Sequence, residues 1–336
     1  MSVRTEPATW DAIAAEWRAL WDATQPPAGP FVTPEFQIGW WEVFGDDREL
    51  DLSAVYEDDT LIGVMPLQRV DGVVRFVGDF EVCDYMDVLS ADGKAEQVVD
   101  ALLDRLDALQ TERADLRGLA EGSTTAALLP AKAESRGWSV TSETEAVCPV
   151  IPLPDGWESY VSGLRKRYRH EVRRKLRNLR DGKAVVDIEV LSDPEQVRER
   201  LPDFLRMMTS SRGDKAQFMT QQMAAFFHTL IGRLADAGQI QLYFLLLDGK
   251  RVATVLCFVS GGQLMLYNSG YDPDFRALSV GIASKVFCVR EAIENGLQAV
   301  NFLRGDEEYK FQMGAKASPV TRLQLTRQPT REAGSR

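Results

Sequence analysis

The segment Phe302-Leu303-Arg304-Gly305-Asp306-Glu307-Glu308-Tyr309-Lys310 is the most informative part of this chain. The apolar run over residues 299–303 predicts a buried strand, and a cluster of ionisable side chains follows it directly. Open α/β sheets tend to form their ligand crevices at the C-terminal ends of strands. The segment therefore indicates a reactive or ligand-binding loop.

These side chains match the needs of amine acylation. That reaction requires a base for the proton of the amine, an acid for the leaving group and a donor for the carbonyl oxyanion. The candidates, in that order, are Asp306 or Glu307, then Tyr309, then Lys310 or Arg304. The alternative is a charged surface loop with a structural Arg–Asp pair.

The residues upstream of this segment leave a predicted strand, turn at Asp272-Pro273 and enter a predicted helix over residues 280–295. The free amides at a helix start, together with the helix dipole, favour an anion. Gly281 would allow close approach of a pyrophosphate, whereas Ser279 as a simple N-cap explains part of the same pattern. We expect an anion at this helix start.

The chain reads as two similarly built halves, each ordered helix, helix, hairpin, strand, helix, strand. The hairpin of the second half turns at Asp248-Gly249, the strongest short hairpin signal. Two prolines and a glycine punctuate residues 151–156. We therefore predict an N-terminal domain over residues 1–153, a C-terminal domain over 154–328 and a polar tail over 329–336.

Composition narrows the range of functions. The chain has 336 residues and a formal net charge of -11, which argues against DNA binding by the surface as a whole. Its four cysteines are widely spaced and only two histidines are present, so neither a metal site nor a disulfide framework is expected.

One helix carries the opposite charge. Residues 165–183 contain ten basic side chains and two acidic ones, with apolar residues every three or four positions. Such a face is either solvated or an anion-recognition surface for the phosphates of coenzyme A, a nucleotide or an RNA acceptor end. Arg169 and Arg173 are the residues we expect to touch a substrate there.

A further candidate lies in the first half, at Asp84-Tyr85-Met86-Asp87. We interpret this stretch as a strand with Asp84 and Met86 on one face and Tyr85 and Asp87 on the other. A half-buried acid on a strand is unusual. Asp84 and Tyr85 are therefore candidate substrate contacts, although structural hydrogen bonding explains them as well.

The N-terminus lacks the basic-then-apolar run of a signal peptide, and no stretch has the length and polarity of a membrane helix. We expect a cytoplasmic protein, monomeric or homodimeric.

Taken together, four motifs resemble the GNAT-type acyltransferases of the BioF2-like and CelD-like group, which is akin to the Fem-type peptidoglycan aminoacyltransferases. The motifs are residues 164–169, the Asp248-Gly249 hairpin, Gly270-Tyr271-Asp272-Pro273 and residues 302–310. The resemblance covers nearly the whole chain. It departs from the common phosphate loop Q/R-x-x-G-x-G/A, because residues 278–283 keep the first Gly and the final Ala but lack the leading Gln or Arg.

The resemblance implies an α/β (α+β) protein of two tandem GNAT-like domains, each a mixed, mostly antiparallel sheet flanked by helices. The second domain would bind acetyl-CoA or another acyl-CoA between splayed strands, and an amine acceptor would lie between the domains. The expected donor contacts are Asn268, Tyr271, Arg276, Ser279, Val280, Gly281, Ile282 and Ala283. The expected acceptor contacts are Asp84, Tyr85, Arg304, Arg169 and Arg173.

Two alternatives stay open. One is a Fem-type aminoacyltransferase that uses aminoacyl-tRNA, with the basic helix holding RNA phosphates. The other is a non-catalytic GNAT-like binding module in envelope or polysaccharide synthesis.

Overall fold

The computed structural model describes residues 2–181, 184–211 and 217–328, and it divides into two compact units. Unit 1 comprises residues up to 146 together with those from 319, and unit 2 comprises residues 147–318. The predicted domain boundary at 153/154 lies close to the observed boundary between residues 146 and 147, but no sequence pattern predicted that the residues after 318 belong to unit 1. The predicted tail lies outside the described residues, as does Lys183 of the basic stretch.

Unit 1 is a mixed sheet with helices. Its elements are β1 (Val3–Pro7), α1 (Trp10–Thr24), η1 (Gly29–Val32), α2 (Pro34–Phe44), β2 (Glu49–Glu57), β3 (Thr60–Val70), β4 (Val73–Phe76), β5 (Leu89–Ser90), α3 (Ala95–Ala108), β6 (Arg113–Leu119), α4 (Thr124–Ser135) and β7 (Trp138–Pro152). The sheet order is β1-β2-β3-β4-β6-β13, with β5 beside β3. Strand β13 (Lys316–Arg327) is the last of the chain and belongs to unit 1 from residue 319. Residues 61–68 of β3 are buried without interruption, so both faces of this sheet are covered.

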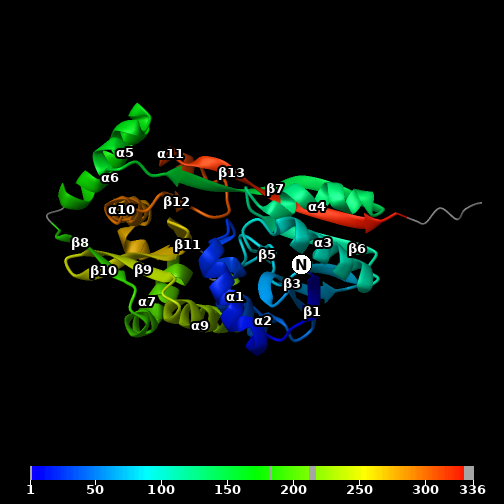
Figure 1. The fold of residues 1–336 in the computed structure, drawn as a ribbon. Helices are drawn as coiled ribbons and strands as arrows, with labels where there is room; N and C mark the ends of the chain where they lie inside the picture. Colours follow the sequence, from blue (N-terminus) through cyan, green and yellow to red (C-terminus); the bar gives the residue numbers. More distant parts are fainter. Residues whose placement is uncertain (1, 182–183, 212–216, 329–336) are drawn as a thin grey trace, which may run out of the picture. The chain divides into compact units, whose positions relative to one another are not determined.

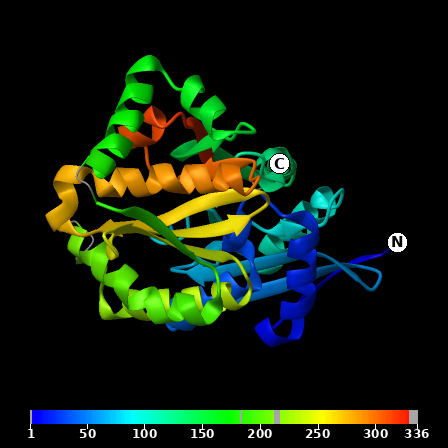
Figure 2. The ribbon, with the colours of Figure 1, turned by 90° about the vertical axis from the view of Figure 1, so that its left-hand side faces the viewer.

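Unit 2 repeats the series. Its elements are α5 (Trp157–Gly163), α6 (Lys166–Asp181), β8 (Val186–Leu191), α7 (Pro194–Ser211), α9 (Gln221–Asp236), β9 (Ile240–Leu247), β10 (Lys250–Ser260), β11 (Gln263–Tyr271), η2 (Pro273–Leu278), α10 (Val280–Glu294), β12 (Ala299–Asn301) and α11 (Glu308–Gln312), together with the end of β7 from residue 147. The sheet order is β8-β9-β10-β11-β12-β7. Helices α7 and α9 lie on one side of β9, β10 and β11, and α10 lies on the other (Figures 1 and 2).

Each half of the chain thus runs strand, two helices, three strands, helix, strand, helix, strand, apart from the short β5 and the pair α5 and α6. In each sheet one neighbouring pair is parallel, β4 with β6 and β11 with β12. The last strand of each series pairs with a strand of the other series. β13, which ends the second series, pairs with β6, and the end of β7, which ends the first series, pairs with β12. The sheet of unit 1 is therefore built from two separate stretches of chain, whereas the paired residues of the unit 2 sheet all lie within residues 147–318.

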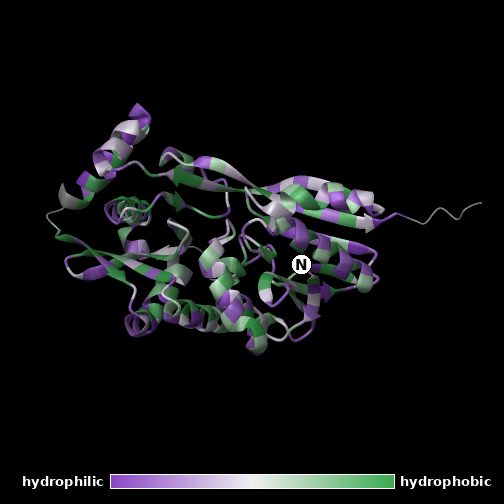
Figure 3. Ribbon diagram, viewed as in Figure 1, coloured by the Kyte–Doolittle hydropathy of each residue, from purple (hydrophilic) through white to green (hydrophobic). Residues whose placement is uncertain are grey.

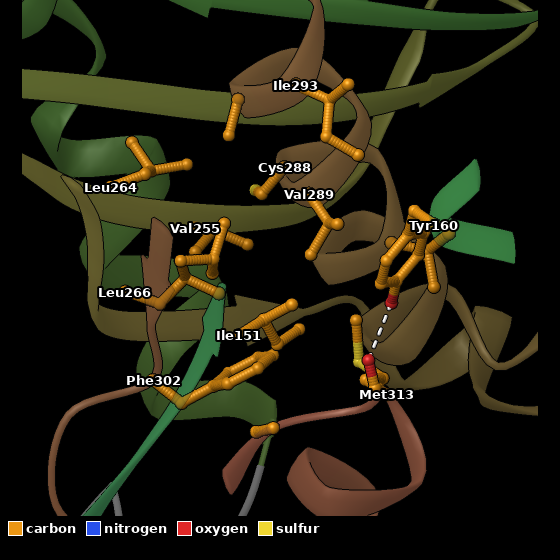
Figure 4. Close-up of a cluster of buried hydrophobic side chains, with 14 of the residues drawn as sticks. Ile151, Tyr160, Val255, Leu264, Leu266, Cys288, Val289, Ile293, Phe302 and Met313 are labelled. Carbon is orange, nitrogen blue, oxygen red and sulfur yellow. Dashed lines mark hydrogen bonds between the residues drawn. The ribbon is translucent and has the colours of Figure 1, made fainter. Parts of the chain in front are cut away.

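The core of unit 2 lies between α10 and the sheet, where Val255, Leu264, Leu266, Val289 and Phe302 are buried (Figure 4). Tyr160 of α5 belongs to this cluster, and its hydroxyl donates to the carbonyl of Met313 at 2.8 Å. Burial holds the pKa of Tyr160 well above its ordinary value, so the phenol stays protonated. This hydrogen bond attaches α5 to the chain just after α11.

Tyr160→Phe should lower the free energy of unfolding by about 1–2 kcal/mol, because the Met313 carbonyl loses its buried donor. Urea denaturation followed by circular dichroism measures the loss. Tyr168→Phe, on the partly buried Tyr168 of α6, is the matched control. Equal stability of the Tyr160 variant and the unaltered chain would show that the Met313 carbonyl finds another donor.

Candidate functional site

Two parallel strands separate at the centre of unit 2. β11 and β12 pair only through residues 263–265 and 299–301, after which β11 continues to Tyr271 while β12 stops. The Asn301 side chain accepts a hydrogen bond of 2.8 Å from the Leu303 amide, and Leu303 takes a positive φ of 54°. These features turn the chain out of the sheet and open a space between the strands.

The start of α10 faces this space. Asp272 accepts from the Asp274 amide and so caps η2, whereas Ser279 adopts a left-handed conformation and makes no side-chain cap. The interpretation of Ser279 as a simple N-cap is therefore wrong. Its backbone serves instead, because the Ser279 carbonyl accepts from the amides of Ile282 and Ala283. The first turn of α10 carries no acidic side chain that would oppose an anion.

A cavity of about 410 Å³ lies at this helix start. Its lining residues are Ser211, Ser269, Tyr271, Arg276, Ser279, Val280, Gly281, Ile282, Lys285, Glu307 and Tyr309. Most predicted donor contacts are thus brought together in one wall. Ala283 is not among the lining residues and is fully buried in the hydrophobic cluster with Val280 and Leu179.

A second, smaller cavity of about 170 Å³ lies between the parted strands. Its lining residues are Val255, Leu266, Tyr267, Asn268, Ser269, Lys285, Phe302, Arg304, Glu307, Tyr309 and Lys310. Four residues line both cavities: Ser269, Lys285, Glu307 and Tyr309. We call these four the junction, because a ligand that extends from one cavity into the other would pass them.

The loop after β12 is held from inside by Lys310. This side chain is only 3% exposed, and its ammonium donates to the carbonyls of Leu303, Arg304 and Gly305 at 3.3, 2.9 and 3.2 Å. It also forms an ion pair of 2.9 Å with Glu307. The predicted cation of this segment is thus fully engaged in shaping the loop and in placing Glu307.

Gly305 is required by the same arrangement. It takes a φ of 121°, and a Cβ there would lie 3.0 Å from the Lys310 Nζ and closer still to the Glu307 carboxylate. Asp306 and Glu307 are both exposed, but Glu307 lines both cavities, whereas Asp306, the alternative base, lines neither.

The stretch around Asp84 is not a strand. Residues 84–88 form an irregular segment of unit 1, and the strand β5 begins only at Leu89, so the predicted alternation of faces is wrong. Asp84 and Tyr85 are both nearly buried, and the Tyr85 ring meets Phe31 edge-on at 5.9 Å. The sequence pattern failed because side-chain hydrogen bonds fix this segment.

Asp87 shows how. Its carboxylate accepts from the Ser123 hydroxyl at 2.6 Å, and Ser123 caps α4. Desolvation by burial raises the pKa of Asp87 to about 6, although the hydrogen bonds from Ser123 and Thr125 oppose the shift. The buried acid of this stretch therefore has a structural partner.

The basic helix is confirmed as α6, and its hydrophilic character is visible in Figure 3. Arg169 is partly buried and donates to the carbonyls of Ser162 and Leu164, at 2.5 and 3.1 Å, whereas Arg173 is exposed. A third cavity, of about 210 Å³, lies beside α6 and shares Ile282 and Tyr309 with the cavity at the start of α10.

Sequence reasoning missed Lys285. Its Nζ donates to the Ser269 hydroxyl and the Gly281 carbonyl, both at 3.0 Å, and lies 5.6 Å from the centre of the Tyr309 ring. Desolvation by burial lowers its pKa to about 8. Cys288 and Cys257 oppose this shift, and the smaller effects of Lys310, which lowers the pKa, and Glu307, which raises it, follow. A lone lysine in the otherwise apolar first turns of α10 was the available signal.

The four cysteines are buried and free. Within the described ranges, no group of three or more His, Cys, Asp or Glu side chains is arranged to hold a metal ion. None of the described helices is long and apolar enough to span a bilayer.

Comparison with known proteins agrees with this geometry. Residues 166–311 match the family model of the acetyltransferase (GNAT) domain. The structure of FemX is similar with a TM-score of 0.64 at 13% identity, over 95% of this chain and 96% of that one. No curated protein is similar enough in sequence to count as a relative.

Two further solved structures share the fold. The C-terminal domain of an Agrobacterium fabrum protein named as a lysylphosphatidylglycerol synthetase has a TM-score of 0.59 at 11% identity, over 96% of this chain and 93% of that one. A Bacteroides thetaiotaomicron protein of unknown function has a TM-score of 0.54 at 12% identity, over 97% and 100%.

The match over residues 166–311 supports an acyltransferase of the GNAT type. Residues 166–311 are a GNAT acetyltransferase domain, and the whole chain has a two-domain fold like that of FemX. The predicted fold class and the resemblance to the GNAT and Fem-type enzymes are confirmed.

Proposed function

We propose that this protein transfers an acyl group from acyl-CoA, most simply acetyl-CoA, to an amine. The observation that carries the proposal is the large cavity at the start of α10 in a GNAT domain, with its helix amides and Arg276 on one side and the junction on the other.

The charge distribution of the larger cavity suits the phosphates of acyl-CoA. Its phosphates would lie at the amides of the first turn of α10, where the helix dipole favours an anion and the exposed Arg276 adds a cation. From there the remainder of the donor would reach the junction. Tyr271 and Ile282 supply apolar wall on the way, and Asn268 lies beyond the junction in the smaller cavity.

The chemistry belongs to the junction and the loop. The acceptor nitrogen attacks the acyl carbon, and the bond from that carbon to sulfur breaks. Glu307 takes the proton from the amine, and Tyr309 gives one to the departing thiolate, so protons and charge balance. Lys310 holds Glu307 in place, and Arg304 in the smaller cavity is the proposed acceptor contact. For Asp306, Asp84, Tyr85, Arg169 and Arg173, the assigned roles stay predictions.

The experiment that tests the donor is titration calorimetry with acetyl-CoA and with CoA at two salt concentrations. We expect one site per chain and micromolar affinity. Arg276→Gln should weaken binding about tenfold, since an ion pair with a phosphate is lost. Arg290→Gln is the control, because Arg290 lies on the same helix and pairs with Glu294 at 2.7 Å.

A second candidate donor is aminoacyl-tRNA, favoured by the similarity to FemX and by the basic face of α6. It predicts no calorimetric signal with either coenzyme A compound, RNA retained through purification and binding that weakens steeply with salt. That combination would contradict the acyl-CoA proposal.

A further inference from the structure

Lys285 occupies a position that the proposed roles leave unexplained. It is partly buried in the second turn of α10 and belongs to the junction. Its two hydrogen-bond acceptors, the Ser269 hydroxyl and the Gly281 carbonyl, are both neutral. An ammonium has three N–H groups, so one is left for a ligand.

The contrast with Lys310 is informative. Lys310 has a carboxylate within 2.9 Å and three carbonyls around it. No ion pair of Lys285 occurs among the residues that the structure describes. A cation withdrawn from water without a carboxylate partner is unfavourable. A buried cation of this kind is typical of a site where a negative charge forms or binds during function.

We propose that Lys285 donates its third N–H to the carbonyl oxygen of the acyl donor and stabilises the negative charge that forms there during transfer. This inference rests on the proposed acyl transfer. The charge appears on the oxygen when the acceptor nitrogen bonds to the carbon, and it disappears when the bond to the leaving group breaks. Lys285 keeps its proton throughout.

The other cations of the site are less suited to this task. Lys310 is occupied by the loop, and Arg276 lines only the larger cavity, beside Ser279. Arg304 lines only the smaller cavity. Lys285 is the cation that lines both, so it lies where a donor from one side meets an acceptor from the other.

The charge of Lys285 makes the reaction sensitive to pH. Because the pKa of Lys285 is lowered to about 8, the rate should fall as the pH rises through that value. The titratable or charged groups that act on Lys285 or line the cavities with it are Cys257 on β10, Cys288 on α10, Tyr267 and Tyr271 on β11, Arg276 in η2, and Arg304, Glu307, Tyr309 and Lys310 beyond β12. Burial raises the pKa of the Cys257 thiol, which removes it as a source of this transition.

Lys285→Met tests the inference on the full chain, with acetyl-CoA and an amine that the wild-type protein acylates. We expect kcat to fall by about 10²–10³-fold, the loss typical of one oxyanion donor, while the affinity for acetyl-CoA changes less than threefold. Lys285→Arg should keep part of the activity and move the alkaline fall in rate to higher pH. Lys316→Met, at an exposed lysine of β13, is the matched control.

The pH dependence of the melting temperature of Lys285→Met distinguishes the proposed catalytic role of Lys285 from a structural role. The unfolded chain binds more protons than the folded one between pH 8 and the ordinary lysine pKa of 10.5, so the cost of the buried charge is full below pH 8 and fades above it. Lys285→Met should therefore melt no lower than wild type at pH 7, and any gain should shrink as the pH rises.

Three results would overturn the inference. They are unchanged turnover in Lys285→Met, a melting temperature that falls with the activity, or a wild-type rate that rises through pH 8, as a lysine acting as base would give. If the wild-type protein itself transfers no acyl group, the proposed function fails and the inference falls with it, which is a different outcome from an active wild type and an equally active variant.

Discussion

A chain carrying Lys310→Met should turn over at least about 100-fold more slowly than wild type. The ammonium of Lys310 joins three carbonyls and Glu307, so its loss frees the loop over residues 303–307 and moves the proposed base. Misplacement of a reacting group by about 1 Å can itself cost about 10²-fold. The measurement is kcat and KM with acetyl-CoA and an amine.

Stability should fall in the same variant, by about 2 kcal/mol, because buried carbonyls lose their donor. The half-exposed Glu307 is hydrated and adds little to this cost. Glu307→Gln separates the two effects: it leaves the carbonyl contacts of Lys310 in place and should lower kcat without a comparable loss of stability. Full activity in Lys310→Met would exclude the loop from catalysis.

Gly270→Ala should destabilise the chain by about 3 kcal/mol, the largest stability loss that we expect from one methyl group here. Gly270 is buried in β11, and its Cβ position would lie 2.6 Å from the Met207 carbonyl oxygen and closer to the Met208 amide. These are backbone atoms of α7, which cannot rotate away as a side chain would. The helix must therefore shift from the sheet.

Urea denaturation at neutral pH measures this loss. Gly232→Ala is the matched control, because Gly232 lies inside α9 with the nearest atom, Arg198 Nε, at 3.9 Å. Alanine is favoured over glycine in a helix, so this variant should gain up to about 1 kcal/mol. Since Ser211 at the end of α7 lines the larger cavity, Gly270→Ala should also weaken donor binding. Equal stability of both variants would show that α7 has room to move.

Local patterns predicted most of the elements. The hairpin of β9 and β10 follows from Asp248-Gly249, where both residues take a positive φ. Strand β1 was missed because all five of its residues are exposed and carry no apolar alternation. The pairing of the strands could not be predicted either, since it depends on residues far apart in sequence.

The candidate site also has features that local sequence patterns predict and features that they do not. The anion-binding character of the α10 start follows from its turn and its glycine, and the loop after β12 from its charges. What Lys310 does with its charge depends on three carbonyls that no composition reveals, and Lys285 reads as a solvated helical lysine until the cavities are seen. The Asp84 stretch misled because Ser123, nearly forty residues away, holds Asp87.

The pairing of β13 with β6 has a consequence for synthesis on the ribosome. Leu323 of β13 pairs with Leu116 of β6, so the sheet of unit 1 stays open at β6 until nearly the whole chain has been made. A domain that precedes another normally folds as soon as it has emerged. Here the earlier half must wait with an unpaired strand edge, a known template for aggregation. We expect nascent chains that stop before residue 316 to be captured by chaperones. The sheet of unit 1 should be completed only when β13 has been synthesised and pairs with β6.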